Sequence, residues 1–424
     1  MINKSENDIG QKQLKWFCII STIFFFIIAF CWAGPSEILE GIKIIIVSRD
    51  TLITDYFELA EYGATFFNGA MLMVLVLLLV HLLKIPFNGL TLAAFFINAG
   101  FALFGKNLVS IAPILLGTYL FAKMQGVSVK RYLYTALFGT CLAPIVTEMV
   151  YLLPFNVYIN LVCAILMGLF IGFILPPLAM HTASMHMGYT LFNVGFAAGI
   201  LGFGIVCVLK AFGLESETTF IWRAGRPLWL VLTLYGYFLA TFLYGLWINK
   251  GKIKPLFQIL RHPGRAVADF VLMDGVGSTL MNMAIVGSFG LTYILLIGGD
   301  LSGPVVGGIL TVFGFGAFGV HLRNFIPCLL GVYISAHFKI FAVDSAAIQL
   351  AALFSVGIAP IAGQFGVIAG FLAGALHTSI VMSTGAMYSG LNLYNNGFST
   401  GFVVIIMIPL LEVVIEKLKK KKKV

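Results

Sequence analysis

The chain has 424 residues, of which 60% are hydrophobic and 10% are charged, and its formal net charge is +9. Soluble globular domains have about 25% charged residues, so this chain has too few polar side chains to cover a surface facing water. The composition indicates an all-α polytopic membrane protein and argues against soluble enzymes, nucleic-acid binders and secreted disulfide scaffolds.

The positive charge is concentrated in short segments beside apolar runs, namely the tail from Lys417 onward and the stretch at 250–265. Such segments are typical of cytoplasmic loops facing anionic headgroups, so we expect membrane lipid and no nucleic acid as a partner. The six cysteines lie inside apolar runs without a C-x-x-C pair, which indicates packing residues rather than disulfides or metal ligands.

Fourteen apolar runs are candidates for membrane helices, which need about 20 residues each. Four runs are short enough to be half-helices or re-entrant pieces. The first could also be a signal peptide, but its length favours an anchor. The runs lie at 15–33, 64–84, 89–105, 107–123, 132–152, 157–180, 189–211, 227–248, 276–298, 303–320, 323–341, 345–362, 364–380 and 398–416.

The distribution of Lys and Arg predicts the orientation. When the N-terminus is placed in the cytoplasm and the sides alternate, most of the 26 Lys and Arg fall inside, and the acidic loop at 34–63 falls outside. We therefore expect a multi-pass protein of the cell membrane with both termini cytoplasmic.

The chain contains an internal repeat. At an offset of 214 residues, 100–105 aligns with 314–319, and Asp55 and Asn68 align with Asp269 and Asn282. Farther along, the offset drifts through small insertions. The predicted units are 1–49 with the first span, 50–226 as the first repeat, 227–263 as a linking span and basic loop, 264–416 as the second repeat, and 417–424 as a polylysine tail.

Equivalent second and ninth spans are separated by seven crossings, an odd number. Equivalent helices then run in opposite directions, which predicts about 14 segments in two inverted-topology repeats, as in alternating-access carriers and some channels. Discontinuous or re-entrant helices are expected in both halves.

Matched prolines mark the predicted helix breaks: Pro113 with Pro327, and Pro144 with Pro360. Interrupted helices in matching positions indicate a site at mid-membrane, because their ends present N–H and C=O dipoles to a solute. The alternative is an ordinary proline kink packed by its neighbours. The stretches from 181 and from 377 are longer than one crossing, which leaves room for a re-entrant segment in each.

Histidines and asparagines near these stretches are candidates for binding a polar solute, because their side chains both donate and accept hydrogen bonds. The alternative is a pair of loops in which Asn caps the next helix. No carboxylate or cysteine accompanies either histidine, so we expect no metal site. The residues are His181 with Thr182 and Asn193 in one copy, and His377 with Thr378, Asn392, Asn395 and Asn396 in the other.

Glu148 is an acid predicted to lie inside a span, where a carboxyl group is expensive, and Gln364 is its aligned partner. These two are the candidates for proton or cation coupling; the alternative is a shallower Glu148 with an interfacial partner. Asp55 and Asp269 are expected to cap helices. Asn68 and Asn282 are expected to line a path or to bridge helices.

G-x-x-x-G motifs at 168/172 with 366/370 and at 195/199 with 397/401, and one more at 370/374, predict close helix crossings through their paired placement. The chain has no nucleotide-binding G-x-x-x-x-G-K-[ST] motif and no H-E-x-x-H motif, so we expect no ATP-driven transport, no cofactor and no catalytic residues.

The sequences at 52–56, 63–68 and 390–398 make the chain resemble a bacterial integral-membrane family that is catalogued only as a domain of unknown function, over nearly its whole length. The resemblance implies a bacterial cell membrane and no assigned activity. The layout is also similar to that of nucleobase and anion carriers, which is an analogy of architecture.

The function expected from the sequence is proton- or cation-coupled secondary transport of a small polar solute or ion, without enzymatic activity. A passive channel of inverted-repeat type is the first alternative, and an intramembrane enzyme or scaffold is the second. Association into a homo-oligomer is left open.

Overall fold

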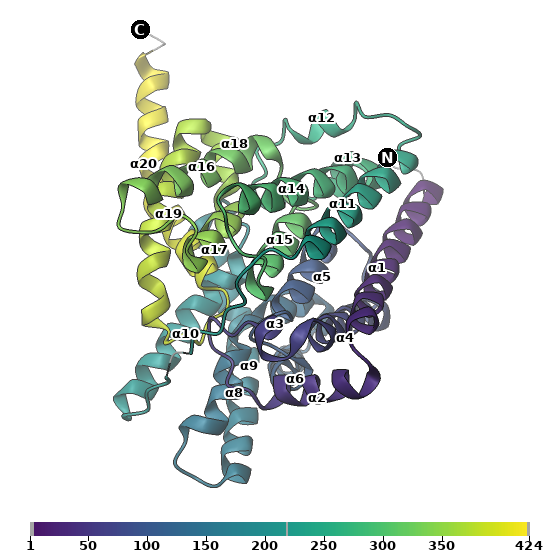
Figure 1. Cartoon of the computed structure of the whole chain (residues 1–424). Helices are drawn as coiled ribbons and strands as arrows, with labels where there is room; N and C mark the ends of the chain where they lie inside the picture. The colour runs from purple at the N-terminus through teal and green to yellow at the C-terminus, as the bar shows by residue number, and fades with distance from the viewer. Residues whose placement is uncertain (1–3, 218, 422–424) are drawn as a thin grey trace.

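The computed structural model describes residues 4–217 and 219–421, so the end of the predicted polylysine tail, 422–424, lies outside the described residues. The described chain is helical and has no β-strand, only three isolated bridges. In Figure 1 the first half lies mostly below the second, and both labelled termini lie toward the top of the view.

Ten helices of the described chain are long and apolar enough to cross a membrane. Each falls within or overlaps one of the fourteen predicted runs, which agrees with a multi-pass membrane protein. The other four runs form shorter helices, α5 (Gly89–Phe101), α6 (Leu108–Met124), α15 (Gly303–Phe315) and α16 (Leu322–Phe338). Each of these begins at a side chain that caps its first turn: Asn88, Asn107, Ser302 and His321.

The remaining elements of the first half are α1 (Lys4–Trp32), α2 (Pro35–Val47), α3 (Tyr56–Leu59), α4 (Glu61–Leu82), η1 (Val129–Tyr132), α7 (Leu133–Gly139), η2 (Thr140–Leu142), α8 (Ala143–Leu152), α9 (Val157–His186) and α10 (Asn193–Ala211). Those of the second half are α11 (Leu228–Ile248), α12 (Leu256–Ile259), α13 (Phe270–Asp274), α14 (Val276–Leu296), α17 (Ala346–Phe354), η3 (Ser355–Ile358), α18 (Ala359–Phe365), α19 (Val367–Met387) and α20 (Asn395–Lys421).

The two halves repeat the same helices in the same order, and the correspondence includes α1 and α11, which the sequence comparison left outside the repeat. α1 packs on α4 where Gly63 meets the Ala29 carbonyl. In the same way, α11 packs on α14 where Gly277 meets the Gly245 carbonyl. The helices α1 and α11 therefore pack in equivalent ways in the two halves.

Apolar side chains cover much of the outer surface as well as the core. On α9, Val162, Leu166 and Phe170 are exposed at a spacing of four residues and so share one face. Exposed apolar surface of this extent is typical of contact with lipid.

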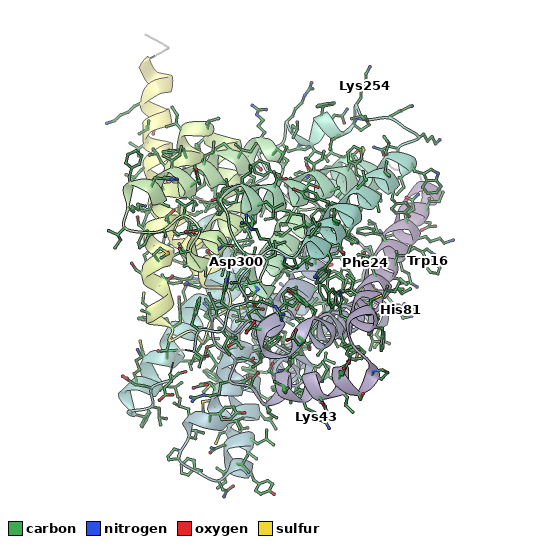
Figure 2. The ribbon with its side chains drawn as sticks, in the orientation of Figure 1. Trp16, Phe24, Lys43, His81, Lys254 and Asp300 are labelled. Atoms are coloured by element: carbon green, nitrogen blue, oxygen red, sulfur yellow. The ribbon has the colours of Figure 1, made fainter. Side chains whose placement is uncertain are left out.

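The loops between the helices gather in two regions, one before the first residue of α4 and one after its last residue. We call the "Asp55 end" the residues 48–59, 212–223 and 299–303, where Trp222 Nε1 donates to Asp300 and the Arg223 amide donates to Asp55. We call the "Asp269 end" the residues 86–89, 187–188 and 262–274, where the Ala266 amide donates to the Gly188 carbonyl. Figure 2 shows Lys43 of α2 in the lower part of the view and Lys254, next to α12, near the top.

Candidate functional site

Each half caps a short helix of the other half. Asp55 caps α3, as predicted, and its Oδ1 also accepts a hydrogen bond of 2.9 Å from the Gly303 amide at the start of α15. Asp269 caps α13 and accepts from the Gly89 amide at the start of α5 at 2.9 and 3.0 Å. Reciprocal contacts between equivalent residues are those of a two-fold axis.

Asn68 and Asn282 form hydrogen bonds to the segments that follow the short helices α5 and α15. Asn68 Nδ2 donates to the carbonyls of Ala102 and Lys106, and Asn282 Nδ2 donates to those of Gly316 and Val320, all within 3.0 Å. Both amides therefore bridge helices, one of the two roles expected for them.

The short helices α5 and α15, one from each half, cross in close contact. A Cβ on Gly100 would lie 2.6 Å from the Gly307 carbonyl oxygen, and the equivalent Gly314 meets Ala93. The late part of each helix thus contacts the early part of the other, so the two helices are antiparallel.

The N-terminal turns of α10 and α20 form a second crossing between the halves. A Cβ on Gly195 would lie 3.1 Å or less from Gly397 Cα and from the nearest Tyr394 ring atom. In the same way, the Phe398 ring packs on Gly199 and the Phe196 ring packs on Gly401. These are the paired G-x-x-x-G motifs, and their predicted close crossing is present. The loops preceding the two helices bond to the other half, Leu191 N to Gly357 O and Leu393 N to Cys141 O.

Of the four predicted helix breaks, two are present. Pro144 and Pro360 begin α8 and α18 directly after the 3₁₀ turns η2 and η3, which interrupt their helices. Pro113 and Pro327 lie inside the continuous helices α6 and α16, so the breaks predicted there are wrong. Their rings pack where Gly168 and Gly370 leave room, as in the alternative of a packed kink.

The re-entrant segments predicted after His181 and His377 are also absent from the described chain. Both histidines lie inside long helices, α9 and α19, because those helices continue past them to His186 and Met387. His181 is exposed, whereas His377 is completely buried.

The second half brings four of the predicted binding residues into one buried cluster beside the α10–α20 crossing. His377 Nδ1 lies 2.8 Å from Ser399 Oγ, the Asn396 side chain faces the imidazole, and Asn395 accepts a hydrogen bond from Thr384. Five buried polar atoms here make no well-aligned hydrogen bond to any described residue: His377 Nε2, Asn392 Nδ2, Asn396 Oδ1 and the hydroxyls of Tyr388 and Tyr394. Four of them face one another in pairs, Asn396 with His377 and Asn392 with Tyr388, and the Tyr394 hydroxyl has no such neighbour among the described residues.

In the first half the equivalent polar groups are paired with one another. Asn193 Oδ1 accepts from Thr182 Oγ1 at 2.9 Å and from His186 Nε2 at 2.8 Å. Thr182 thus corresponds to Thr384 and not to Thr378, which corrects the sequence alignment and removes His181 from the site. His186 was not predicted, and its burial could not be read from the sequence.

A cavity of about 500 Å³ leads from the Asp269 end toward the α10–α20 crossing. Met187, Gly188 and Ala266 line its outer part, and Asn193 and Tyr394 line its inner part. Among the described residues, none of its lining comes from the Asp55 end.

A buried lysine in the connection between α5 and α6, Lys106, was also not predicted. Its Nζ donates to Asn98 Oδ1 at 2.7 Å and to Thr140 Oγ1 at 3.0 Å. The sequence placed it between two apolar runs, and only its contacts show that 1% of the residue is exposed.

Glu148 is buried in α8 and ion-paired, whereas its aligned partner Gln364 is exposed. Arg49 donates to both carboxylate oxygens of Glu148, at 2.5 and 3.2 Å, and Ser216 adds a hydrogen bond of 2.8 Å. The structure does not bring Glu148 and Gln364 together, and it places Glu148 near the Asp55 end.

Two aspartates at the Asp55 end titrate unusually. Burial raises the pKa of Asp50 to about 7, although hydrogen bonds from Tyr56 Oη and Thr147 Oγ1 oppose the shift. Burial likewise raises the pKa of Asp55 to about 6, against the backbone amides that it accepts from. Both carboxyl groups therefore bind protons more readily than exposed aspartates.

Comparisons with curated proteins and with solved structures gave no match. A model for the family described as "Protein of unknown function (DUF1576)" matches residues 34–211 and 248–413, one segment in each half. Because these two segments cover most of the chain, this multi-pass membrane protein belongs to the DUF1576 family.

Proposed function

We propose that the protein is a secondary active transporter that carries a small polar solute across the cell membrane by alternating access, coupled to a proton or cation gradient. The observation that carries the proposal is the set of buried polar atoms beside the crossing of α10 and α20 that make no well-aligned hydrogen bond to the described residues. A buried polar atom without a hydrogen bond costs about 1–3 kcal/mol, so a cluster of them is explained best by a solute that binds there.

The proposal includes fourteen membrane-embedded helical segments, seven in each half, with the halves inverted relative to each other. The helices α1 and α11 support the inversion, because both are of spanning length and they contact each other in opposite directions. Trp32 at the end of α1 packs on Trp229 at the start of α11, whereas Phe17 packs on Tyr244 near the end of α11. A two-fold axis that relates antiparallel spans lies in the membrane plane.

The cavity favours a carrier over a passive channel. It reaches the α10–α20 crossing from the Asp269 end, while loops at the Asp55 end bond to one another, for example Thr51 to Thr219. Access from one side at a time is what alternating access requires. With the predicted orientation, the open side is the cytoplasmic one.

The first experiment is a screen of small polar solutes for thermal stabilisation of the purified protein, since a ligand of the folded state raises its apparent stability. Each stabilising solute is then tested for uptake into proteoliposomes. Saturable uptake driven by an imposed gradient supports the carrier, and flux that increases linearly with concentration would favour the channel.

The matched variants are Asn396→Leu and Asn282→Leu. We expect Asn396→Leu to abolish uptake without lowering the unfolding temperature, because it removes an amide oxygen that makes no well-aligned hydrogen bond to the described residues. Asn282→Leu should lower the unfolding temperature, because both hydrogen bonds to the α15–α16 connection are lost. Full uptake by Asn396→Leu would overturn the proposed site.

A further inference from the structure

The buried amino group of Lys106 has no counter-charge among the described residues. Its Nζ makes hydrogen bonds to two neutral oxygens, and an ammonium group has three donors. No ion pair joins Lys106 to any described carboxylate. A buried cation without a partner is unfavourable, and such residues mark ion or substrate paths in membrane proteins.

The internal repeat shows that packing does not require this cluster. At offsets of 214, 214 and 216 residues, Asn98, Lys106 and Thr140 correspond to three valines of the second half. These are Val312, Val320 and Val356, all fully buried. The same place in the fold is therefore built with apolar side chains in one half and with a lysine and its two hydrogen-bond acceptors in the other.

The Phe101 ring lies between Lys106 and Tyr394, and Tyr394 lines the cavity. The Lys106 Nζ is 5.4 Å from the centre of the Phe101 ring, and the Phe101 and Tyr394 ring centres are 5.3 Å apart. The Tyr394 hydroxyl has no hydrogen-bond partner. Both the Phe101 and the Tyr394 rings would have to move for a solute in the cavity to reach the Lys106 Nζ.

The other charged and dipolar groups around this place also favour negative charge. The N-termini of α10 and α20, which carry partial positive charge, meet at the crossing beside Tyr394. The buried acids lie at the two ends of the molecule and are already bonded: Asp50 to Tyr56, Glu148 to Arg49, and Asp269 to backbone amides.

We propose that the solute of the central site is a small anion, a carboxylate or an inorganic oxyanion, and that Lys106 supplies its counter-charge. This inference rests on the proposed transport function and names its substrate class. Asn98 and Thr140 hold the lysine side chain in place, and the Tyr394 hydroxyl, which makes no hydrogen bond to the described residues, is available to donate to the anion.

The test uses the full-length protein in proteoliposomes with two sets of probes at equal ionic strength. The anions are acetate, formate, nitrate and inorganic phosphate, and the neutral solutes are acetamide and urea. The variants are Lys106→Met and the triple change Asn98→Val, Lys106→Val, Thr140→Val, which copies the second half. Lys339→Met is the control, because Lys339 is bonded to Ala375 and Ser379 at the end of α16.

We expect the wild type and Lys339→Met to take up at least one of the anions. Uptake by Lys106→Met and by the triple variant should fall about ten-fold or more, as for the loss of a charge-assisted hydrogen bond. The unfolding temperature of the triple variant should not fall. Carboxylates and oxyanions are distinguished by which of the four probes is transported.

Uptake of the neutral solutes but of no anion, unchanged in the triple variant, would overturn the anion inference and leave the transport proposal standing. If no probe is transported, the anion site is tested by whether the same anions raise the unfolding temperature. Stabilisation of the wild type but not of Lys106→Met would support an anion site and count against transport, whereas no stabilisation of the wild type by any anion would overturn the anion site.

Discussion

Replacing Gly172 of α9 with alanine tests how closely the helices pack. A Cβ at this position would lie 1.9 Å from the carbonyl oxygen of Ile114 in α6, and ordinary contact begins at 3.4 Å. The helices must therefore separate by about 1.5 Å, the difference of these two distances. Because the obstacle is backbone, no side-chain rotation can relieve it.

The expected loss of stability is about 3 kcal/mol. Overpacking by one methyl group costs about 1–3 kcal/mol, and the separation also stretches the 2.9 Å hydrogen bond from Thr118 Oγ1 to the Gly172 carbonyl, worth about 1 kcal/mol. At about 2 cal/mol/K per residue, a 424-residue chain that unfolds as one unit would lose about 3 °C in Tm.

The measurement is thermal unfolding of purified protein in detergent, followed by intrinsic fluorescence. Gly374→Ala should behave like Gly172→Ala, because its Cβ would lie 2.0 Å from the Cys328 carbonyl. Gly204→Ala in α10 is the control, since no atom lies within 4 Å of its Cβ and alanine favours the helix by about 0.5–1 kcal/mol. A Tm for Gly172→Ala equal to that of Gly204→Ala would refute the reasoning.

Three further predictions concern charged groups. Asp269→Ala removes the side-chain caps of two helices and should lower stability by about 1–2 kcal/mol, whereas the exposed control Asp344→Ala should not; equal Tm values would contradict the capping role. The raised pKa of Asp50 stabilises the fold at low pH, and this contribution is lost as pH rises from about 4 through about 7. Tm should therefore fall over this range less steeply in Asp50→Asn than in the wild type, and an identical slope would exclude Asp50 as the cause. Glu148→Gln breaks the pair with Arg49 and should cost about 1.5–3 kcal/mol by thermal unfolding. If Glu148 carries the coupled proton, the same variant removes the pH dependence of uptake; uptake that depends on pH as in the wild type would rule out that role.

The sequence predicted the features that depend on local chemistry or on residues repeated in both halves. Asp55 and Asp269 were expected to cap helices, and they do, because the capping interaction is formed with the next residues in the chain. The identical offset of 214 residues predicted that α5 and α15 are equivalent. It could not predict that the two helices contact each other.

Features that depend on neighbours distant in sequence were missed. Whether a proline breaks its helix depends on the space beside it, and Gly168 provides that space for Pro113. The repeat of α1 in α11 was missed because it is preserved in packing and not in residue identity. Lys106 and His186 carry no local signal of burial, so only the folded chain identifies them.

The hydrogen bonds by which each half caps a helix of the other half have a consequence for biosynthesis. The Gly89 amide is bonded by an aspartate 180 residues farther along the chain. At about 5–20 residues per second, a ribosome makes that distance in about 10–40 s. During this interval α5 has been synthesised, but its first turn lacks the carboxylate that accepts from it in the finished protein. The contact between the two halves at Gly89 can therefore form only after Asp269 has been translated.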